Sequence, residues 1–400
     1  MATTMVEQRA APVADGALLG TYRPAPPVFV RGEGVRVYDD AGRAYLDFVA
    51  GIGVNALGYG DASVRAALER ALSTGLIHLS NLYRTEPAAA LAQMLVDASF
   101  ADRVFFCNSG AEATEAAFKF ARRWARSRGG EAKHEIVALR NSFHGRLFGA
   151  LAATDRPAMQ APFTPLMPGV RFVDPGDPAS LDTALDPART AAIIVEPVQG
   201  EGGVRPLPAD VLARLREAAD ANDALLIFDE VQCGLGRTGH LFAYQASGVI
   251  PDILTLAKPL AGGLPMGAVL LTGRVAETIQ PGDHATTFGG GPLVATVAAT
   301  VFARIADPAF LNRVRVLGEY LHEQLRELAA SCPGIVDVRG AGLMWGIALD
   351  RPAAPVAAAA LEAGLLVATA GERVLRLLPP LVIRESDIDE AVAILGEVLA

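Results

Sequence analysis

Lysine is scarce in this sequence of 400 residues. Of its 35 lysine and arginine residues, only Lys119, Lys133 and Lys258 are lysines. A guanidinium keeps its proton and is a poor nucleophile, whereas a lysine amine can lose its proton and attack a carbonyl carbon. Any chemistry that needs a lysine amine is therefore limited to three positions.

Cysteine and positive charge are also limited. The three cysteines, Cys107, Cys233 and Cys332, are scattered and lack metal-ligand spacing. This pattern favours a reducing cytoplasm and predicts neither a disulfide framework nor a metal site. The formal net charge is −9. Because no basic stripe is present to neutralise phosphates, we expect no nucleic-acid partner.

Long apolar runs are missing, although 51% of the residues are hydrophobic. The most apolar stretch, residues 356–370, is interrupted by Glu362, Gly364 and Thr369. No predominantly apolar run reaches the roughly 18 to 20 residues that a bilayer requires. The first 20 residues lack the cationic start and apolar block of a secretory signal. We therefore expect a soluble, cytoplasmic protein without a membrane partner, long enough for two domains.

Short apolar runs alternate with helical stretches between about residues 100 and 272. The expected strands are residues 103–107, 135–139, 191–195, 225–228, 253–256 and 267–271. Apolar strands that alternate with helices indicate an α/β fold with a mostly parallel sheet covered on both faces. Ligands in such folds bind beyond the carboxyl ends of the strands.

The last hundred residues have a different pattern. Long helices are expected at 292–305 and 312–330, strands at 335–339, 343–349 and 374–377, and a final helix from Glu385. We therefore expect a large domain over residues 51–291 and a smaller α+β domain over residues 292–400. Residues 1–50 are expected to form an N-terminal segment that packs with the smaller domain.

The first segment with candidate chemistry lies between Cys107 and Ala113, where a strand ends and a helix begins. Ser109 and Glu112 match a capping box. Free backbone N–H groups at a helix start that is approached through glycine can bind a phosphate. An ordinary helix cap is the alternative interpretation.

The second segment is the buried strand that ends in Asp229 and Glu230. An aspartate at this edge can pair with a pyridinium nitrogen and keep it protonated, so that the ring accepts electrons. A capping or solvated acid is the alternative interpretation.

The third segment surrounds Lys258 with apolar residues and glycines. An apolar setting lowers the pKa of a lysine amine, as imine formation needs. The alternative is a lysine that extends from a strand end into solvent. Lys119 continues a helix and Lys133 lies in a loop, so both are weaker candidates. A phosphate loop, a ring acid and a lysine in this order together indicate a pyridoxal phosphate site.

Seven ordered segments make the sequence resemble the class III (fold type I) aminotransferases, and most closely the acetylornithine and ornithine aminotransferase branch. They are GIGVNALG (51–58), FCNSGAEATE (106–115), NSFHGR (141–146), VEPVQGEGG (195–203), FDEVQ (228–232), AKPLAGGLPMGA (257–268) and TTFGG (286–290). The resemblance extends over nearly the whole chain. It implies pyridoxal 5'-phosphate as the cofactor. Two positions depart from the family pattern: Tyr59-Gly60-Asp61 replaces a frequent His-Pro, and Gly291 replaces an asparagine.

The resemblance also implies roles for individual residues. The implied cofactor-binding residues are Ser109, Gly110, Ala111, Phe143, Asp229, Val231, Gln232, Lys258 and Thr287. Among them, Gly110 and Ala111 would donate N–H groups to the phosphate, and Lys258 would carry the cofactor as a Schiff base. Asp229 would bind the ring nitrogen, Gln232 the phenolic oxygen, and Phe143 and Val231 the two faces of the ring. Thr287 would reach the phosphate of the neighbouring subunit, which implies a homodimer with its active site at the subunit interface.

Two arginines and one acid are implied to bind the substrates. Arg146 matches the position that holds the donor's carboxylate, and Arg376 matches the one that binds the α-carboxylate of glutamate. A planar guanidinium suits bidentate carboxylate binding. Glu196 is expected to pair with Arg376 while the other donor is bound. Without the resemblance, both arginines would be read as ordinary surface charges.

The expected reaction moves the terminal amine of N-acetylornithine to 2-oxoglutarate, giving a semialdehyde and glutamate, in arginine biosynthesis. N-succinylornithine, a lysine-pathway analogue, free ornithine and 4-aminobutyrate are alternative donors, and an aminomutase of the same fold is an alternative enzyme. A binding protein that keeps the fold without turnover is disfavoured by the joint presence of Lys258, Asp229, Arg146 and Arg376. A dinucleotide loop is disfavoured because no Gly-x-Gly-x-x-Gly stands between a strand and a helix.

Overall fold

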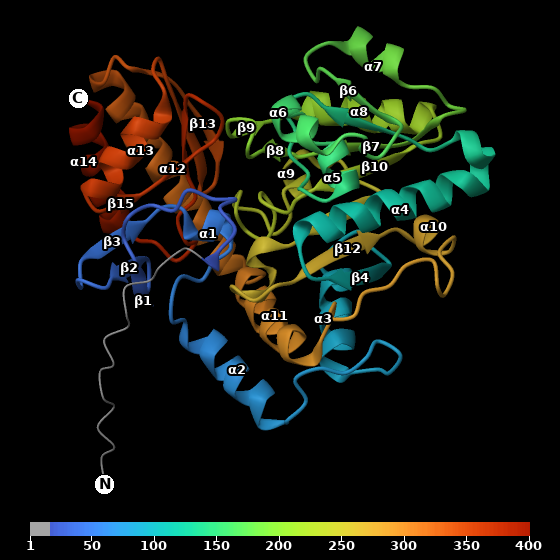
Figure 1. Cartoon of the computed structure of the whole chain (residues 1–400), viewed down its shortest axis with the longest axis horizontal. Coiled ribbons are helices and arrows are strands. Elements are labelled where there is room, and N and C mark those ends of the chain that lie inside the picture. The colour runs from blue at the N-terminus through green and yellow to red at the C-terminus, as the bar shows by residue number, and fades with distance from the viewer. Residues whose placement is uncertain (1–16) are drawn as a thin grey trace.

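A seven-stranded sheet forms the centre of the larger part of the molecule (Figure 1). The computed structural model describes residues 17–400, so residues 1–16 of the expected N-terminal segment lie outside the described residues. The strands, in their order across the sheet, are β4 (Arg103–Cys107), β12 (Gly267–Leu271), β11 (Ile253–Leu256), β10 (Leu225–Asp229), β7 (Thr190–Val195), β5 (Glu135–Leu139) and β6 (Val170–Val173).

The expected mostly parallel α/β sheet is confirmed. Strands β11, β10, β7, β5 and β6 pair in parallel, and β12 alone runs antiparallel to both of its neighbours, β11 and β4. The six expected strands form within one residue of their predicted bounds. The edge strand β6 was not expected, because only its last residue, Val173, is buried and its second residue is the exposed Arg171.

Helices cover both faces of this sheet. Apolar residues of α4 (Gly110–Gly129), among them Phe120 and Trp124, pack on one face against Ile136, Ile194 and Ile227. The alternate side chains of the same strands point to the other face, where they join residues of α8 (Ala209–Ala221) and α11 (Pro292–Ile305) in a second core. The period-2 alternation of strand side chains thus divides one continuous apolar run between two cores.

The C-terminal residues form a second sheet with its own helices. Its strand order is β13 (Ile335–Ala341), β14 (Met344–Leu349), β17 (Val374–Leu377) and β16 (Ala368–Thr369). The helices of this part are α12 (Pro308–Ser331), α13 (Ala353–Glu362) and α14 (Glu385–Leu399). Helix α12 begins four residues earlier than expected, at Pro308, because Asp307 accepts the N–H of Ala309 and caps it.

The N-terminal strands lie beside this C-terminal part (Figure 1). Strands β1 (Phe29–Glu33), β2 (Arg36–Asp39) and β3 (Ala44–Asp47) form an antiparallel meander, and β3 pairs in parallel with β15 (Leu365–Leu366). This pairing supports the division of the chain at residues 50 and 291, which we keep as a proposal.

The remaining elements are short or connect the two parts. They are α1 (Ala50–Gly53), α2 (Ala62–Ser73), α3 (Glu86–Asp97), η2 (Gly130–Ala132), α5 (Phe148–Ala152), α6 (Pro157–Gln160), η3 (Ala161–Phe163), α7 (Pro178–Ala184), β8 (Val198–Gln199), β9 (Arg205–Pro206), α9 (Tyr244–Ser247), η4 (Lys258–Ala261) and α10 (Gly273–Ala276). Helix α11 packs against α2, α3 and η4.

In the described chain, no single helix has the length and hydropathy of a membrane span. Helices α11 and α12 meet those criteria only when they are taken together, and the angle between them is 64°.

Lys133 is a structural residue that lies two positions before β5. Its side chain is buried, and Nζ donates to the carbonyl oxygens of Pro187 (2.5 Å) and Asn222 (3.1 Å). The amine therefore joins three segments, and burial lowers its pKa. A buried carbonyl that loses its only donor remains desolvated without compensation.

We predict that Lys133→Met lowers the free energy of unfolding by about 2 kcal/mol, because two buried carbonyl groups lose their donor. Denaturant or thermal unfolding measures the change, with Lys119→Met, at a more exposed helical position, as the matched control. Equal stability of Lys133→Met and the wild-type protein would contradict this structural role.

Candidate active site

The carboxyl ends of β10 and β11 open onto a cavity of about 430 Å³, a volume in the range of small-molecule sites. Eight of the nine expected cofactor residues line it: Ser109, Gly110, Ala111, Phe143, Asp229, Val231, Gln232 and Lys258. Arg146 and Glu196 also line it. Residues that are up to 149 positions apart in the sequence therefore face one space, as expected for the edge of a parallel sheet.

Lys258 lies in η4, two residues after the end of β11. Its backbone has φ +35°, a value that is strained for a residue with a side chain. Desolvation lowers the pKa of the amine, and the positive charge of Arg376 lowers it further. The negative charges of Glu201, Asp229 and Glu196 act in the opposite direction. A lysine amine with a lowered pKa can act as a nucleophile and a base near neutral pH.

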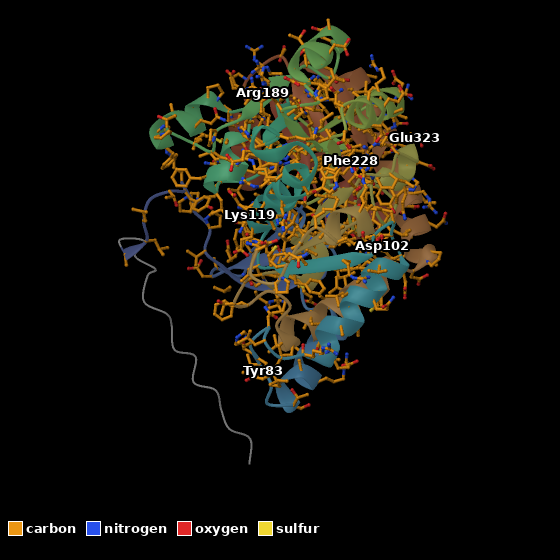
Figure 2. All side chains as sticks on the ribbon, turned by 90° about the vertical axis from the view of Figure 1, so that its right-hand side faces the viewer. Tyr83, Asp102, Lys119, Arg189, Phe228 and Glu323 are labelled. Atoms are coloured by element: carbon orange, nitrogen blue, oxygen red, sulfur yellow. The ribbon has the colours of Figure 1, made fainter. Side chains whose placement is uncertain are left out.

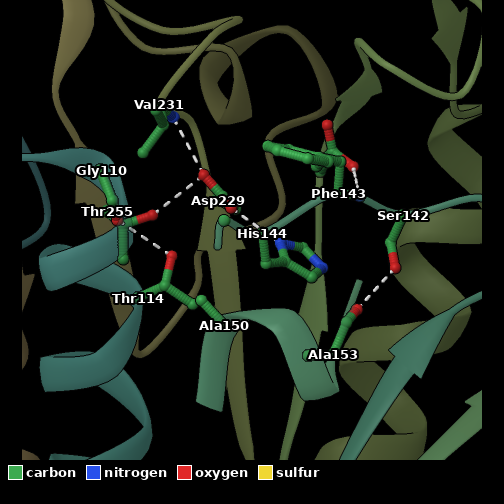
Figure 3. Close-up of polar contacts among 12 residues, drawn as sticks. Gly110, Thr114, Ser142, Phe143, His144, Ala150, Ala153, Asp229, Val231 and Thr255 are labelled. Carbon is green, nitrogen blue, oxygen red and sulfur yellow. Dashed lines mark hydrogen bonds and ion pairs between the residues drawn. The ribbon is translucent and has the colours of Figure 1, made fainter. Parts of the chain in front are cut away.

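Asp229, the last residue of β10, is held by three donors (Figure 3). Its Oδ2 lies 2.7 Å from Nδ1 of His144, and its Oδ1 accepts from Oγ1 of Thr255 and from the N–H of Val231, both at 3.1 Å. An ionised carboxylate only accepts hydrogen bonds, so Nδ1 of His144 carries the proton. Both oxygens of Asp229 are thus fixed at the base of the cavity.

The neighbouring acid, Glu230, points away from the cavity. Its two carboxylate oxygens accept the backbone N–H groups of Ala243 and Tyr244, at 2.6 and 2.7 Å. Burial raises its pKa to about 8. Of the two acids at the end of β10, only Asp229 therefore faces the cavity.

His144 is a site residue that the sequence analysis did not identify. It is buried in the cavity wall, and its backbone N–H donates to Oγ1 of Thr154. Its Nε2 has no hydrogen-bond partner among the described residues. Its position in the segment NSFHGR, between Phe143 and Arg146, is the signal that could have identified it.

The start of α4 forms the other end of the cavity. Oγ of Ser109 accepts the N–H of Glu112, as a helix cap does. The expected capping box is incomplete, because the Glu112 carboxylate accepts instead from the backbone and side chain of Asn108. Within residues 17–400, the N–H groups of Gly110 and Ala111 have no protein acceptor. These two N–H groups can bind an anion, and the helix dipole favours it.

Glycine at position 110 leaves room beside Val231. A methyl group on Gly110 would lie 2.6 Å from Cγ1 of Val231, closer than carbon atoms approach. The cavity thus combines unpaired N–H groups, a fixed carboxylate and an amine of lowered pKa, and these groups fit the phosphate, the ring nitrogen and the aldehyde of pyridoxal phosphate. The donor set therefore agrees with the expected cofactor.

The structure corrects the expected partner of Arg376, which is Glu201 and not Glu196. Nη1 of Arg376 forms an ion pair with Oε1 of Glu201 and lies 3.3 Å from Oε1 of Gln232. Glu196 cannot turn toward Arg376 without losing two buried bonds, since it accepts the N–H groups of Phe143 (2.8 Å) and Gly200 (3.1 Å). Burial raises the pKa of Glu196 to about 7.

The two expected substrate arginines differ in burial. Arg376 is 2% exposed, and its Nε has no partner among the described residues. Arg146 is exposed at the cavity, with its guanidinium carbon 5.7 Å from the ring centroid of Phe143. In the described chain no carboxylate lies within ion-pair distance of Arg146.

Thr287 lies apart from the other expected cofactor residues. It is exposed in a separate hollow that His78, Asn81 and Gly289 also line. Tyr59 and Gly291, the two departures from the family pattern, do not line the main cavity. Tyr59 instead donates to Oδ2 of Asp47 at 2.6 Å.

Comparison with known proteins agrees with this geometry. A family model described as aminotransferase class-III matches residues 21–399. The chain is 49% identical to the mitochondrial acetylornithine aminotransferase of Alnus glutinosa over 96% of this chain and 85% of that protein. It is similar to the N-acetylornithine aminotransferase structure of Stenotrophomonas maltophilia, with a TM-score of 0.83 and 38% identity over 94% and 96% of the two chains. An ornithine aminotransferase structure from Toxoplasma gondii, with pyridoxal phosphate partly occupying its active site, has a TM-score of 0.90 and 33% identity over 96% and 92%.

We predict that His144→Ala weakens pyridoxal phosphate binding roughly 10-fold or more, because a hydrogen bond to a buried carboxylate contributes about 1.5 to 3 kcal/mol. Titration of the visible absorbance measures the dissociation constant. His144→Asn, whose amide can still donate, serves as the conservative control. An unchanged dissociation constant for His144→Ala would refute the view that this ring holds Asp229 in place.

Proposed function

Because the chain belongs to the class-III aminotransferases and is a pyridoxal-phosphate-dependent transaminase, we propose that its amino donor is N-acetylornithine. The terminal amine would pass to 2-oxoglutarate, giving a semialdehyde and glutamate. The names of the relatives support this donor. The observation that carries the proposal is a cavity lined by the exposed Arg146 and by Glu201, whose carboxylate forms an ion pair with the buried Arg376 behind the cavity wall.

We propose that the residues of the cavity bind the cofactor in the roles that the family resemblance implies. When bound, pyridoxal phosphate supplies an aldehyde that condenses with amines and a ring that accepts an electron pair from the adjacent carbon. Gly110 and Ala111 hold its phosphate, and Asp229 holds its ring nitrogen protonated. Lys258, whose pKa is lowered, binds the aldehyde and moves a proton at the substrate carbon that carries the amine.

Arg146 suits a donor whose carboxylate is remote from its reacting amine. Three carbon atoms separate the terminal nitrogen of N-acetylornithine from the carbon that bears its carboxylate. With the amine at Lys258, that carboxylate lies toward the cavity mouth, where Arg146 is exposed and without an ionic partner in the described chain. A bidentate ion pair there orients the donor.

Arg376 suits a carboxylate that lies next to the reacting carbon, as in glutamate and 2-oxoglutarate. While the donor is bound, no carboxylate reaches Arg376, and Glu201 neutralises it. When 2-oxoglutarate binds, its α-carboxylate takes the place of Glu201. An exchange of one anion for another avoids leaving a buried guanidinium unpaired, which is strongly destabilising.

A homodimer is the proposed assembly. Exposed apolar side chains gather on the segment that contains Leu76, Ile77, Leu82 and Tyr83, and on the loop of Phe288. Tyr83 lies at the outer edge of the described chain (Figure 2). Exposed apolar clusters of this kind suit a protein interface. Thr287, next to Phe288, would then reach the phosphate in the partner's cavity.

We also propose a cytoplasmic location. The mitochondrion is the alternative, because some relatives are named as mitochondrial.

We predict that the protein forms glutamate from 2-oxoglutarate in a donor panel, and fastest with N-acetylornithine. N-succinylornithine, ornithine and 4-aminobutyrate are the comparison donors, and Lys258→Ala is the inactive control. Stoichiometric use of 2-oxoglutarate separates transamination from an aminomutase reaction, which returns the amine to its own substrate. A faster reaction with another donor would replace N-acetylornithine in the proposal.

We predict that Glu201→Ala slows the half-reaction with N-acetylornithine about 10-fold and leaves the half-reaction with glutamate near the wild-type rate. Without Glu201, the buried guanidinium is unpaired whenever no substrate α-carboxylate is bound to it, and this includes the complex with the donor but not the complex with glutamate. Single-turnover changes in visible absorbance measure each half-reaction, with Glu196→Gln as the comparison at the neighbouring acid. Equal slowing of both half-reactions would contradict the exchange.

A further inference from the structure

Apart from its position over the Phe143 ring, the Arg146 side chain has no contact in the described chain that supports it. Among the described residues, its guanidinium forms no hydrogen bond and no ion pair. Its place at the cavity therefore depends on the backbone around it. That backbone continues into α5, which begins at Phe148, two residues after Arg146.

Helix α5 is capped by an acid from another helix. Its N-cap residue, Leu147, has no side-chain cap. Oε1 of Glu115, on α4, instead accepts the N–H groups of Gly149 (2.6 Å) and Ala150 (3.0 Å). These are donors of the first turn of α5, which would otherwise have no partner in the helix.

The fit between Glu115 and α5 is close. A methyl group on Gly149 would lie 2.5 Å from Oε2 and 3.0 Å from Cδ of Glu115, so only glycine admits the carboxylate at this point. The half-buried Glu115 has no cation within ion-pair distance in the described chain. Its hydrogen bonds go to the start of α5, and a negative charge there also matches the helix dipole.

The loop before α5 is pressed onto the first turn of α4. Gly145 has φ +131°, and a methyl group on it would lie 2.9 Å from Cβ of Ala111 and 3.0 Å from Cβ of Ala150. At the other end of α5, Oγ1 of Thr154 accepts the N–H of His144. Figure 3 shows Ala150 beside Thr114 of α4. One helix thus supplies the N–H groups of Gly110 and Ala111 and, one turn later, the acid that fixes the segment of Arg146.

We propose that Glu115 is a positioning residue for Arg146: it fixes the start of α5 and so places the guanidinium that binds the donor's carboxylate. The inference rests on the proposed function for the role of Arg146. Glu115 does not touch the substrate. Its loss therefore affects the substrate that uses Arg146 and spares the substrate that uses Arg376.

Steady-state kinetics on the holoenzyme test the proposal. Glu115→Ala should raise the KM for N-acetylornithine roughly 10-fold, because a displaced binding group loses its alignment, and should leave the KM for 2-oxoglutarate at the wild-type value. Glu115→Gln, whose amide oxygen still accepts both N–H groups, should restore most of the affinity. Glu323→Ala, at an exposed position of α12, is the matched control (Figure 2).

A double variant separates positioning from a general loss of structure. In an Arg146→Ala background, Glu115→Ala should raise the KM for the donor no further, since both changes remove one interaction. Gly149→Ala keeps Glu115 and inserts a methyl group against its carboxylate, so it should also raise the donor KM selectively. It tests the proposal even if Glu115→Ala fails to fold.

Hydrogen exchange gives a readout that does not depend on the donor. Residues 147–153 of the holoenzyme should exchange their amide hydrogens faster in Glu115→Ala than in wild type or Glu115→Gln, as measured by mass spectrometry. Unchanged exchange, an unchanged donor KM, an equal rise in both KM values, or a further rise in the Arg146→Ala background would each overturn the proposal. Failure of the wild-type protein to use N-acetylornithine would overturn the proposed function instead, and the exchange measurement would still decide the role of Glu115.

Discussion

The half-buried amine of Lys258 is partly desolvated near a second cation, and the charges of the site are arranged around this constraint. Desolvation and Arg376 both lower the pKa of Lys258. Arg376 is itself buried, so it needs an anion at all times. Glu201 provides that anion, while Asp229 is held apart by His144, Thr255 and the backbone of Val231. Each carboxylate thus has a separate position and a separate set of partners.

The sheet makes this separation possible. Asp229 ends β10, and Lys258 follows the adjacent parallel strand β11 by two residues, so the spacing of the two strands brings the acid and the start of η4 close together. Thr255, which pairs with Asp229 in the register of the two strands, donates to the Asp229 carboxylate. The register of the two strands thus places one of the three donors that hold the ring acid.

The sequence predicts the central sheet well because its strands are short apolar runs between helices. It predicts Lys258 because lysine is rare, and Asp229 because a buried strand ends there. It does not separate Glu196 from Glu201, since both occur in the segment VEPVQGEGG and only burial distinguishes them. Glu196 follows β7 directly and its oxygens are used by the N–H groups of Phe143 and Gly200, whereas Glu201 lies beyond β8 and faces Arg376. Such long-range pairing is not encoded in local spacing.

The two substrate arginines illustrate two ways to place a guanidinium, and neither is visible in composition. Arg376 lies in a strand between β14 and β16, so its direction is fixed by the sheet, and the movable part is its acid partner. Arg146 lies in a loop and is exposed, so the cavity does not fix its side chain and its backbone must be fixed instead. A buried arginine thus requires an exchangeable anion, and an exposed one requires a rigid loop. Glu201, in the cavity wall, meets the first requirement and Glu115, on α4, meets the second, so a cavity that binds two different carboxylates uses two acids besides Asp229.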